Sequence, residues 1–515
     1  MALLLGIDLG TSSLKAVLVD SETGRVIRTA IRPTPTDHPR PGWSEHAPED
    51  IWQAVAACIR EAAGGQPVAA LAISSMAEAG LLVDRENRPV APVIAWYDRR
   101  SEPQAAWIEQ QVDMSRLYRI TGQRVSPSFG ITKLLWLRDN DPAFSRGVRW
   151  LPLPSYILWR MCGEQMVDYT IAARTLLFDQ NTLGWSKDLL ATFGLPEDIL
   201  PRVAVGGTPV GNVNAEAAQQ TGLRQSTLCV LGGHDHLCAA LASGAHAPGA
   251  VVESTGSANA LLMLLPRFLP DPSLAPRGYA SYAYLRPGIW ALKGGLKSAG
   301  SAVEWLARML SVDGAPDYAR LEAAAREGVG RRAGPLWLPH LIGSGTPEGD
   351  RFSRAALVGA INEHTSGDLF RGMLESLACW LRHNLEEMTQ ITGQRTNSMI
   401  LTGGATRLRL LSQLKADVTG IAMRIPRVEE AASVGAALLA GQGAGIITHL
   451  EEATTNLRGD CAEILPDASR AAWYDQLYHT AYRPLYTTLQ PVNAALEKLN
   501  QQGETGYGPQ PNRLE

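Results

Sequence analysis

The sequence has little of what marks secreted, membrane-spanning or nucleic-acid-binding proteins. Its 515 residues include six cysteines, and no two of them have the Cys-x-x-Cys spacing of a zinc or redox site. No uncharged apolar run is long enough to cross a bilayer, so we expect no membrane association. The net charge of −4 provides no basic surface, so we expect no nucleic-acid partner. The scattered cysteines predict reduced thiols in a cytoplasmic protein; they are Cys58, Cys162, Cys229, Cys238, Cys379 and Cys461.

The composition that remains is that of a globular enzyme. Hydrophobic residues make up 45% and charged residues 19% of the chain, which is typical of a soluble α/β protein. A single core rarely organises 515 residues, so we expect two large domains. The opening residues lack the basic segment of a signal peptide and are interpreted as a β-strand. A homodimer is the assembly we expect for an enzyme of this size.

A turn close to the N-terminus is the first segment typical of a binding site. It lies between two hydrophobic runs, and Asp8 stands near the end of the first run. Gly10 permits a tight turn, so that Thr11 and Ser12 can face an anion, and Lys15 adds a positive charge. A carboxylate suits Mg²⁺, whereas hydroxyls and a cation suit polyphosphate. The segment lacks a Walker-type glycine run, and an ordinary hairpin turn is the alternative interpretation.

The order of the predicted elements repeats once along the chain. Each half begins with a strand and a turn rich in glycine, serine and threonine, which indicates a duplicated nucleotide clamp with a cleft between its halves. Segment 246–249, His-Ala-Pro-Gly, is a natural boundary. We therefore expect a first domain over residues 1–247, a second over 248–490 and a polar tail over 491–515, frayed from about residue 501. The predicted elements are strands in 2–32, 67–74, 80–83, 93–96, 228–231, 250–253 and 399–401, with helices at 48–63, 237–242, 410–418 and 467–490.

Another segment typical of a functional site places an acid between a strand and a helix. Asp235 either accepts a proton in catalysis or caps the helix that follows. His234 and His236 flank it, but no third ligand is expected nearby, so a zinc site is not predicted. We expect His234 to contact substrate and His236 to pack.

Taken together and in this order, five segments resemble the FGGY carbohydrate kinases, which belong to the sugar kinase, actin and heat-shock ATPase superfamily. The resemblance covers residues 3–490 and implies an α/β fold of two ribonuclease H-like domains that close over a cleft. It also implies transfer of the γ-phosphoryl group of ATP to a sugar hydroxyl with Mg²⁺ as cofactor. The segments are Asp8-x-Gly10-Thr11-Ser12, Gly233-His234-Asp235, Ser254-Thr255-Gly256-Ser257, Thr402-Gly403-Gly404-Ala405 and Glu430-Ala431-Ala432-x-x-Gly435-Ala436-Ala437.

The resemblance also implies roles for individual residues. Asp235 matches the catalytic base, and Asp8 and Asp235 are the expected metal-side carboxylates. The nucleotide would be held by Asp8, Gly10, Thr11, Ser12 and Lys15 from the first domain and by Thr255, Gly256, Gly403, Gly404 and Ala405 from the second.

The segments expected to bind the acceptor match no single subfamily. Glu78 stands where xylulose kinases have His and where glycerol kinases have Glu, but Ala77 replaces the Arg that glycerol kinases carry before it. A carboxylate here would accept bonds from hydroxyls and repel a sugar acid such as gluconate. We expect a ketopentose such as D-xylulose, with L-xylulose, fuculose, ribulose, glycerol or erythritol as alternatives. The predicted acceptor contacts are Met76, Ala77, Glu78, Trp96, Asp98, Arg99, His234 and Asp235, with an Asp98–Arg99 ion pair as the structural alternative.

Two other classes of protein use a similar clamp. A chaperone or actin-like ATPase would share the nucleotide turns but would lack a base in the context of Asp235. A sensor that binds sugar without phosphoryl transfer would lose that base or the phosphate turns. The chain keeps both features, which favours a kinase.

Overall fold

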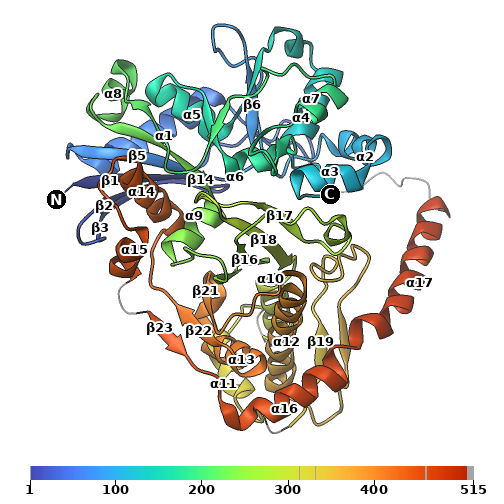
Figure 1. The fold of residues 1–515 in the computed structure, drawn as a ribbon. Helices are drawn as coiled ribbons and strands as arrows, with labels where there is room; N and C mark the ends of the chain where they lie inside the picture. Colours follow the sequence, from blue (N-terminus) through green and yellow to red (C-terminus); the bar gives the residue numbers. More distant parts are fainter. Residues whose placement is uncertain (1, 312–313, 331, 459–460, 507–515) are drawn as a thin grey trace.

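The computed structural model describes residues 2–311, 314–330, 332–458 and 461–506. Two halves, each built around a β-sheet with helices on its faces, lie one above the other (Figure 1). The upper half in that view comes from the N-terminal part of the chain, and the lower half from the C-terminal part. This mixed α/β arrangement confirms the fold class expected from the sequence.

The first sheet has six strands in the order β13-β14-β5-β1-β2-β3. Strand β1 pairs antiparallel with β2 and parallel with β5, and β5 pairs parallel with β14. The first three strands form the predicted meander, and β14 extends past the predicted strand end to His234. The strands are β1 (Leu3–Leu9), β2 (Ser13–Asp20), β3 (Val26–Pro33), β5 (Val68–Ser75), β13 (Pro209–Asn212) and β14 (Leu228–His234).

Helix α1 (Pro48–Ala63) covers one face of this sheet and has the predicted bounds. Pro48 at its start and the acids Glu49 and Asp50 in its first turn suit the positive end of the helix dipole. Gly64 ends the helix in the left-handed conformation that glycine adopts without strain.

Smaller elements complete the N-terminal half. A four-stranded sheet consists of β4 (Glu45–His46), β7 (Val93–Ile94), β6 (Gly80–Val83) and β8 (Arg149–Pro152). Two-stranded sheets are formed by β9 (Met166–Asp168) with β12 (Arg202–Ala204), and by β10 (Phe178–Asp179) with β11 (Gly184–Trp185). The helices are α2 (Glu102–Gln111), α3 (Met114–Thr121), α4 (Gly130–Asn140), α5 (Leu153–Cys162), α6 (Tyr169–Ala172), α7 (Lys187–Thr192) and α8 (Ala215–Thr221).

The second sheet repeats the pairing of the first. Its seven strands lie in the order β17-β18-β16-β15-β21-β22-β23. Strand β15 pairs antiparallel with β16 and parallel with β21, as β1 does with β2 and β5. The strands are β15 (Val251–Thr255), β16 (Asn259–Leu265), β17 (Ala280–Ala283), β18 (Trp290–Leu296), β21 (Ser398–Thr402), β22 (Ala422–Ile425) and β23 (Ala462–Ile464).

Helices surround this second sheet. The longest, α12 (Ser366–Thr392), is largely buried beneath it and opens with a capping box made by Thr365 and Asp368. The others are α10 (Gly300–Met309), α11 (Tyr318–Ala325), α13 (Arg409–Thr419) and α15 (Leu450–Arg458), and a short two-stranded sheet pairs β19 (Leu336–Leu338) with β20 (Ala356–Val358).

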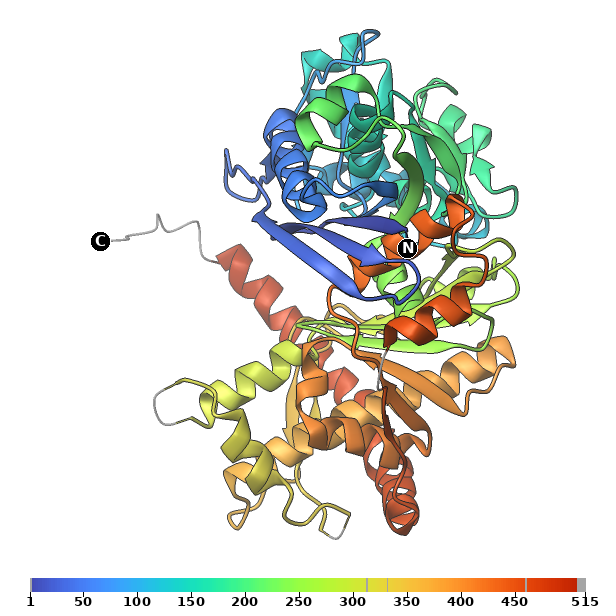
Figure 2. The same ribbon diagram turned by 90° about the vertical axis from the view of Figure 1, so that its left-hand side faces the viewer.

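Two helices join the halves. Helix α14 (Ala431–Gly443) belongs to the C-terminal part of the chain but packs against α9 (Asp235–Ala242), β1 and β5, and it is the orange helix against the blue strands in Figure 2. The contact is so close that a Cβ on Gly435 would lie 2.0 Å from the carbonyl oxygen of Cys238, which excludes any larger residue there. One apolar cluster runs through both helices and into both sheets. The interior of the protein is therefore continuous between the halves.

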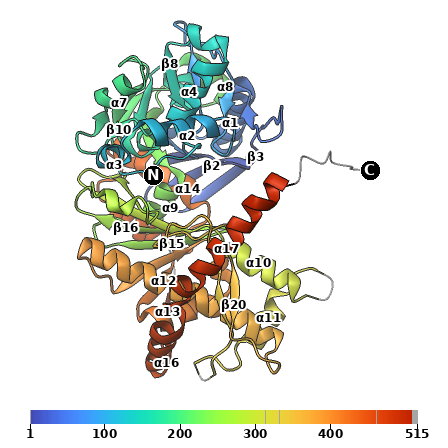
Figure 3. The same ribbon diagram turned by 90° about the vertical axis from the view of Figure 1, so that its right-hand side faces the viewer.

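The C-terminal segment differs from the single closing helix that the sequence predicted. It consists of α16 (Ala471–Gln476), a π-helical stretch (Leu477–Tyr482) and α17 (Leu485–Gly506), which projects from the lower half (Figure 3). Pro484, which has no amide hydrogen, stands where the new helix begins. Helix-favouring residues then extend α17 beyond Gln501, where fraying was expected. The rest of the predicted tail, 507–515, lies outside the described residues. In the described part of the chain, no helix has both the length and the apolar character that crossing a membrane requires.

Candidate functional site

Neighbouring strands of the first sheet bring its predicted site residues together. Asp8 on β1 is in register with Ser74 on β5, and Ser74 is in register with Gly233 on β14. The parallel strands β1, β5 and β14 therefore end at one edge, where Asp235 begins α9. The Ser74 hydroxyl donates a hydrogen bond of 3.0 Å to Asp8 Oδ1. The carboxyl edge of parallel strands is where α/β proteins place their ligands.

Asp8 and Asp235 form an electrostatically strained pair of carboxylates. Burial, together with the nearby charge of Asp235, raises the pKa of Asp8 to about 7. Burial also raises the pKa of Asp235 to about 6, although the His236 amide donates to its Oδ1 over 2.6 Å. The start of α9 and this hydrogen bond favour the charged form of Asp235, but the loss of solvation is the larger effect. With a pKa of about 6, Asp235 is still mostly ionised at neutral pH.

The two carboxylates fit a hard divalent cation. No described residue donates a hydrogen bond to Asp8 Oδ2 or to Asp235 Oδ2. A cation between them would relieve the repulsion that raises the pKa of Asp8. Oxygen donors of this kind are the ligands that Mg²⁺ prefers.

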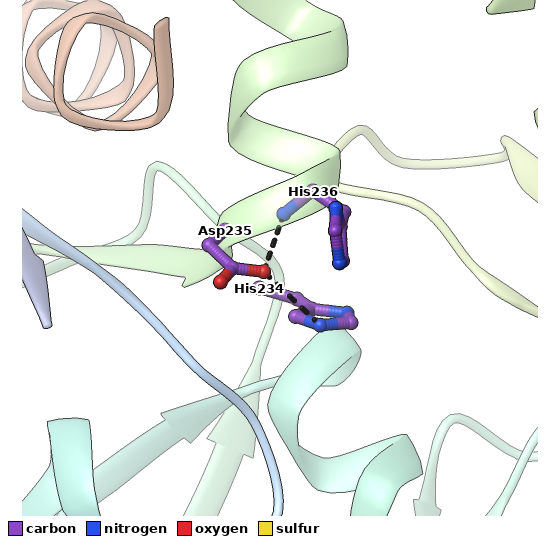
Figure 4. A group of neighbouring side chains, drawn as sticks. All are labelled: His234, Asp235 and His236. Atoms are coloured by element: carbon purple, nitrogen blue, oxygen red, sulfur yellow. Dashed lines mark hydrogen bonds and ion pairs between the residues drawn. The ribbon is translucent and has the colours of Figure 1, made fainter. Parts of the chain in front are cut away.

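Both histidines lie beside Asp235, as Figure 4 shows. His234 Nε2 is 3.2 Å from Asp235 Oδ1, and the Thr170 hydroxyl accepts from the His234 amide over 2.8 Å. The sequence argument that no third ligand lies nearby is wrong, because Asp235 itself completes a group whose ligand atoms lie within 4.8 Å of one another. Burial lowers the pKa of His234 well below its usual value, so its ring is neutral at physiological pH.

Glu78 lies in the same cleft but already has a cationic partner. Its backbone takes the left-handed conformation with φ 65°, and Arg174 Nε donates to its Oε1 over 2.7 Å, with Arg174 Nη2 bonding the same oxygen. Lys133 Nζ, which is buried, donates to the Glu78 carbonyl over 2.8 Å. The Arg174 charge compensates Glu78, so the predicted repulsion of acidic acceptors is weaker than the sequence indicated.

The remaining predicted acceptor residues are less accessible than expected. Met76 and Ala77 are buried, and the Met76 amide donates to the Leu9 carbonyl. These two residues therefore support the end of β5 from inside the protein. Trp96 is 39% exposed, and its indole N–H donates to the Thr11 hydroxyl over 2.9 Å. This bond connects the segment expected to bind acceptor with the turn expected to bind phosphate.

The predicted ion pair between Asp98 and Arg99 is wrong, because each residue pairs with another residue. Asp98 is buried, and its carboxylate accepts from the Ser44 amide and from Arg100, whose Nη2 lies 2.8 Å from Oδ2. Arg99 is exposed and pairs with Glu102 over 2.7 Å. With both oxygens of Asp98 satisfied inside the protein, its role in this structure is to hold the segment in place.

The turn over residues 10–13, expected to bind phosphate and called here the first phosphate turn, has its predicted form. The Gly10 amide donates to the Ser13 carbonyl over 3.1 Å, which closes the turn and leaves Ser12 exposed. Lys15 is not free, however, because its Nζ pairs with Glu430 over 2.6 Å. Glu430 precedes α14, so this ion pair also fixes the two halves against each other.

The turn over residues 254–257, also expected to bind phosphate and called here the second phosphate turn, is supported by a buried charge pair. Lys415 Nζ, on α13, bonds Glu253 Oε2 over 2.8 Å and the Thr255 hydroxyl over 3.2 Å. Asn259 also donates to that hydroxyl. Thr255 is therefore held within the protein, whereas Gly256 is exposed on the turn and open to a ligand.

Two adjacent glycines at the end of β21 differ in what requires them. Gly403 has φ 88°, and a Cβ there would lie 2.5 Å from the Thr255 carbonyl oxygen, so the fold itself requires glycine. At Gly404, a Cβ would meet nothing within 4 Å. The turn is exposed at both glycines, and Ala405 behind them is half-buried. An exposed surface without side chains fits a flat ligand such as a nucleotide.

Four charged residues of the site were missed from the sequence. Arg174 and Lys133 lie outside the five segments that carry the resemblance. Lys293, on β18, reaches the neighbourhood of Asp235 from the other half, and burial together with Arg174 lowers its pKa to about 8. Lys415 lies on an amphipathic helix with no motif around it. Only the tertiary structure brings the last two to the cleft.

Comparison with known proteins agrees with this geometry. The model of the FGGY carbohydrate kinase N-terminal domain matches residues 3–242, and that of the C-terminal domain matches residues 254–444. The chain is 32% identical to a glycerol kinase of Citrifermentans bemidjiense, over 87% of this chain and 91% of that protein. It is 30% identical to the xylulose kinase of Escherichia coli, over 95% of this chain and 100% of that protein.

A solved structure is similar along nearly the whole chain. The xylulose kinase from Rhodospirillum rubrum has a TM-score of 0.87 and 28% identity, with 96% of this chain and 100% of that chain covered. The two family models and these relatives lead to one conclusion: the chain belongs to the FGGY family of carbohydrate kinases.

Proposed function

We propose that this carbohydrate kinase transfers the γ-phosphoryl group of ATP to a hydroxyl of a small sugar or polyol, with Asp235 as the base. The observation that carries the proposal is the place of Asp235, next to Asp8 and within the field of Glu78 and Lys293. Its raised pKa, about 6, makes it a stronger proton acceptor than an ordinary aspartate while it stays ionised at neutral pH.

In the proposed reaction, Asp235 orients the acceptor hydroxyl and takes its proton as the oxygen attacks the γ-phosphorus. Residues from both halves hold ATP: Thr11 and Ser12 in the first phosphate turn, and the backbones of Gly256, Gly403, Gly404 and Ala405 in the second half. Lys293 supplies positive charge beside Asp235 from the second half. Catalysis then depends on alignment and electrostatic stabilisation, as in other phosphoryl transfers.

Asp8 and Asp235 are the proposed holders of Mg²⁺. The chemistry that Mg²⁺ supplies to phosphoryl transfer is neutralisation of charge on the phosphate oxygens. The two free Oδ2 atoms and the raised pKa of Asp8 support this assignment.

For the acceptor, we propose a ketopentose such as D-xylulose. Relatives named xylulose kinase and relatives named glycerol kinase match the chain at similar identity, so polyols and other ketoses are the alternatives. Glu78 Oε2 has no hydrogen-bond donor among the described residues and is free to accept from an acceptor hydroxyl. The test is ADP release with ATP and Mg²⁺ across ketoses, aldoses, polyols and sugar acids. A kinase shows acceptor-dependent release, whereas a sugar sensor binds without release.

The pH profile follows from the pKa of Asp235. We expect kcat/KM for the acceptor to fall about tenfold per pH unit below about pH 6, because protonated Asp235 no longer accepts a proton. Above that pH the base is ionised, and Asp8, whose pKa burial raises to about 7, is the next group of the site to titrate. The measurement is initial rates between pH 4.5 and 8 at subsaturating acceptor. A profile that is flat down to pH 5 would remove Asp235 as the base.

A Glu78→Gln variant tests the acceptor site. We expect the KM for the acceptor to rise about tenfold or more, because a charged acceptor of hydrogen bonds is lost, while the KM for ATP changes less than about twofold. Steady-state kinetics with each substrate varied separately measures both. Glu164→Gln, which removes an exposed partner of Arg202, is the matched control. Equal shifts in both KM values would place Glu78 outside the acceptor site.

A further inference from the structure

A large cavity between the halves is lined by five cations, three of which form no ion pair with a described carboxylate. It has a volume of about 620 Å³ and is bordered by the end of α2 and segment 123–129 from the first half, and by β18 and segment 344–351 from the second. Five of its lining residues are Arg or Lys, and its one carboxylate is Glu109. The lining includes none of the residues predicted to bind the nucleotide. Arg174, which bonds Glu78, and Lys293, which lies near Asp235, are among its lining residues, so the cavity adjoins the predicted acceptor site.

The five cations fall into two groups. Arg174 and Lys293 face Glu78 and Asp235, which balance their charge. The other three are Arg124, Lys297 and Arg351, and no described carboxylate forms an ion pair with any of them. Burial, with the charges of Arg124 and Arg351, lowers the pKa of Lys297, so the three lie close enough to repel one another. All three side chains are exposed to solvent, which screens their repulsion, and an anion that enters the cavity would face three cations at once.

The backbone around these three cations is fixed. The Ser281 amide donates to the Gly122 carbonyl over 2.8 Å, which anchors the segment of Arg124 to the second half. The Thr346 amide donates to the Gly295 carbonyl over 2.9 Å, which ties the segment of Arg351 to the strand before Lys297. The three side chains thus start from positions that the fold determines.

The geometry of β18 indicates how far Lys297 lies from the reacting group beside Asp235. Lys293 lies beside Asp235, and Lys297 comes four residues later, directly after the strand. Residues separated by an even number point to the same face of a strand, and four residues span roughly 13 Å. Lys297 is therefore displaced along the cavity from Lys293 and from the reacting hydroxyl beside Asp235.

We propose that Arg124, Lys297 and Arg351 form a binding site for a carboxylate or phosphate group that bridges the two halves of the cleft. Arg124 comes from the first half, and Lys297 and Arg351 come from the second, so a bound anion connects both. Arginine and lysine together bind such groups through charge-assisted hydrogen bonds. The anion has two sources: the far end of an acidic or phosphorylated acceptor, or a separate phosphorylated molecule beside a neutral acceptor. The first source rests on the proposed function, and the second does not.

Calorimetric titration without ATP tests this site apart from turnover. The probes are xylitol, D-xylonate, a pentitol phosphate and inorganic phosphate, each titrated into the wild-type protein and an Arg124→Gln/Lys297→Gln variant. We expect at least one anionic probe to bind about tenfold tighter to the wild type than to the variant, with xylitol unchanged. Raised ionic strength should weaken the same probe. A Lys187→Gln/Arg202→Gln variant, which alters exposed pairs elsewhere, is the control.

The outcomes separate the two sources. Tighter binding of xylonate or the pentitol phosphate than of xylitol assigns the site to the acceptor. Binding of inorganic phosphate, with xylitol and xylonate alike, assigns it to a separate anion. If the wild type and the folded variant, checked by circular dichroism, bind every probe equally, the proposal is overturned. An Asp235→Asn protein that keeps anion binding without turnover separates this site from the kinase reaction.

Discussion

An Asp235→Asn variant is expected to lose about 10²–10⁴-fold in kcat, because its amide keeps the shape of the side chain but accepts no proton. ATP affinity should stay within a few-fold, since the proposed nucleotide contacts lie on the phosphate turns and at Gly403 and Gly404. The His236 amide still finds an oxygen acceptor at residue 235, so the start of α9 is preserved. Steady-state rates and nucleotide titration measure the two quantities separately.

An acid in a similar position elsewhere provides the control. Asp188 lies in the first turn of α7, is exposed and pairs with Arg116, so Asp188→Asn removes a helix-terminal charge outside the cleft. Its kcat should stay within about twofold of the wild type. Retention of kcat by Asp235→Asn would show that another group accepts the proton, and the reaction assigned to this cleft would need a different base.

Lys415→Met is expected to lower the free energy of unfolding by about 3–5 kcal/mol. Glu253 is 1% exposed, and Lys415 is the cation that pairs with it, so the variant leaves a buried carboxylate with no cation and with Asn259 as its remaining side-chain donor. The Thr255 hydroxyl loses a donor at the same time. Because Thr255 begins the second phosphate turn, the KM for ATP should rise as well. Chemical denaturation at pH 7.5 measures the stability change.

Restoring charge balance distinguishes the ion pair from simple packing. A Lys415→Met/Glu253→Gln variant has no buried charge and should recover part of the lost stability. Arg308→Met, which breaks an exposed pair with Glu304 on α10, should cost less than about 1 kcal/mol and serves as the control. A loss in Lys415→Met no larger than in this control would mean that Glu253 is stabilised by other means.

The sequence predicted the fold where local patterns and topology agree. The meander, α1 and the strand ends that carry Asp8 and Asp235 follow from hydrophobic runs bounded by glycine and polar turns. Duplication was visible because β15 and β21 end in turns similar in composition to that after β1. The C-terminal segment was harder, because the single helix expected over 467–490 is divided before Leu485, and α17 then continues past Pro491 to Gly506.

The candidate site was predictable in its turns and not in its charge partners. Lys15 and Glu430, which pair in the structure, lie 415 residues apart in the chain, and nothing local to either indicates the other. Arg174 reaches Glu78 in the same way, and this contact weakens the argument that Glu78 repels acids. Asp98 was predicted to bind acceptor because it lies in a charged segment after Trp96. In the structure it is buried and pairs with Arg100, so it supports the segment instead.

The most direct test of phosphoryl transfer follows the label of γ-³²P-ATP. With the acceptor that gives the fastest ADP release, we predict that the label appears in the acceptor in equal amount to ADP, and that Asp235→Asn removes this transfer. A kinase that closes over its substrates excludes water, so little label should appear as inorganic phosphate. Label found only as inorganic phosphate, in the presence of every acceptor tested, would contradict the kinase function and favour an ATPase that uses the same clamp.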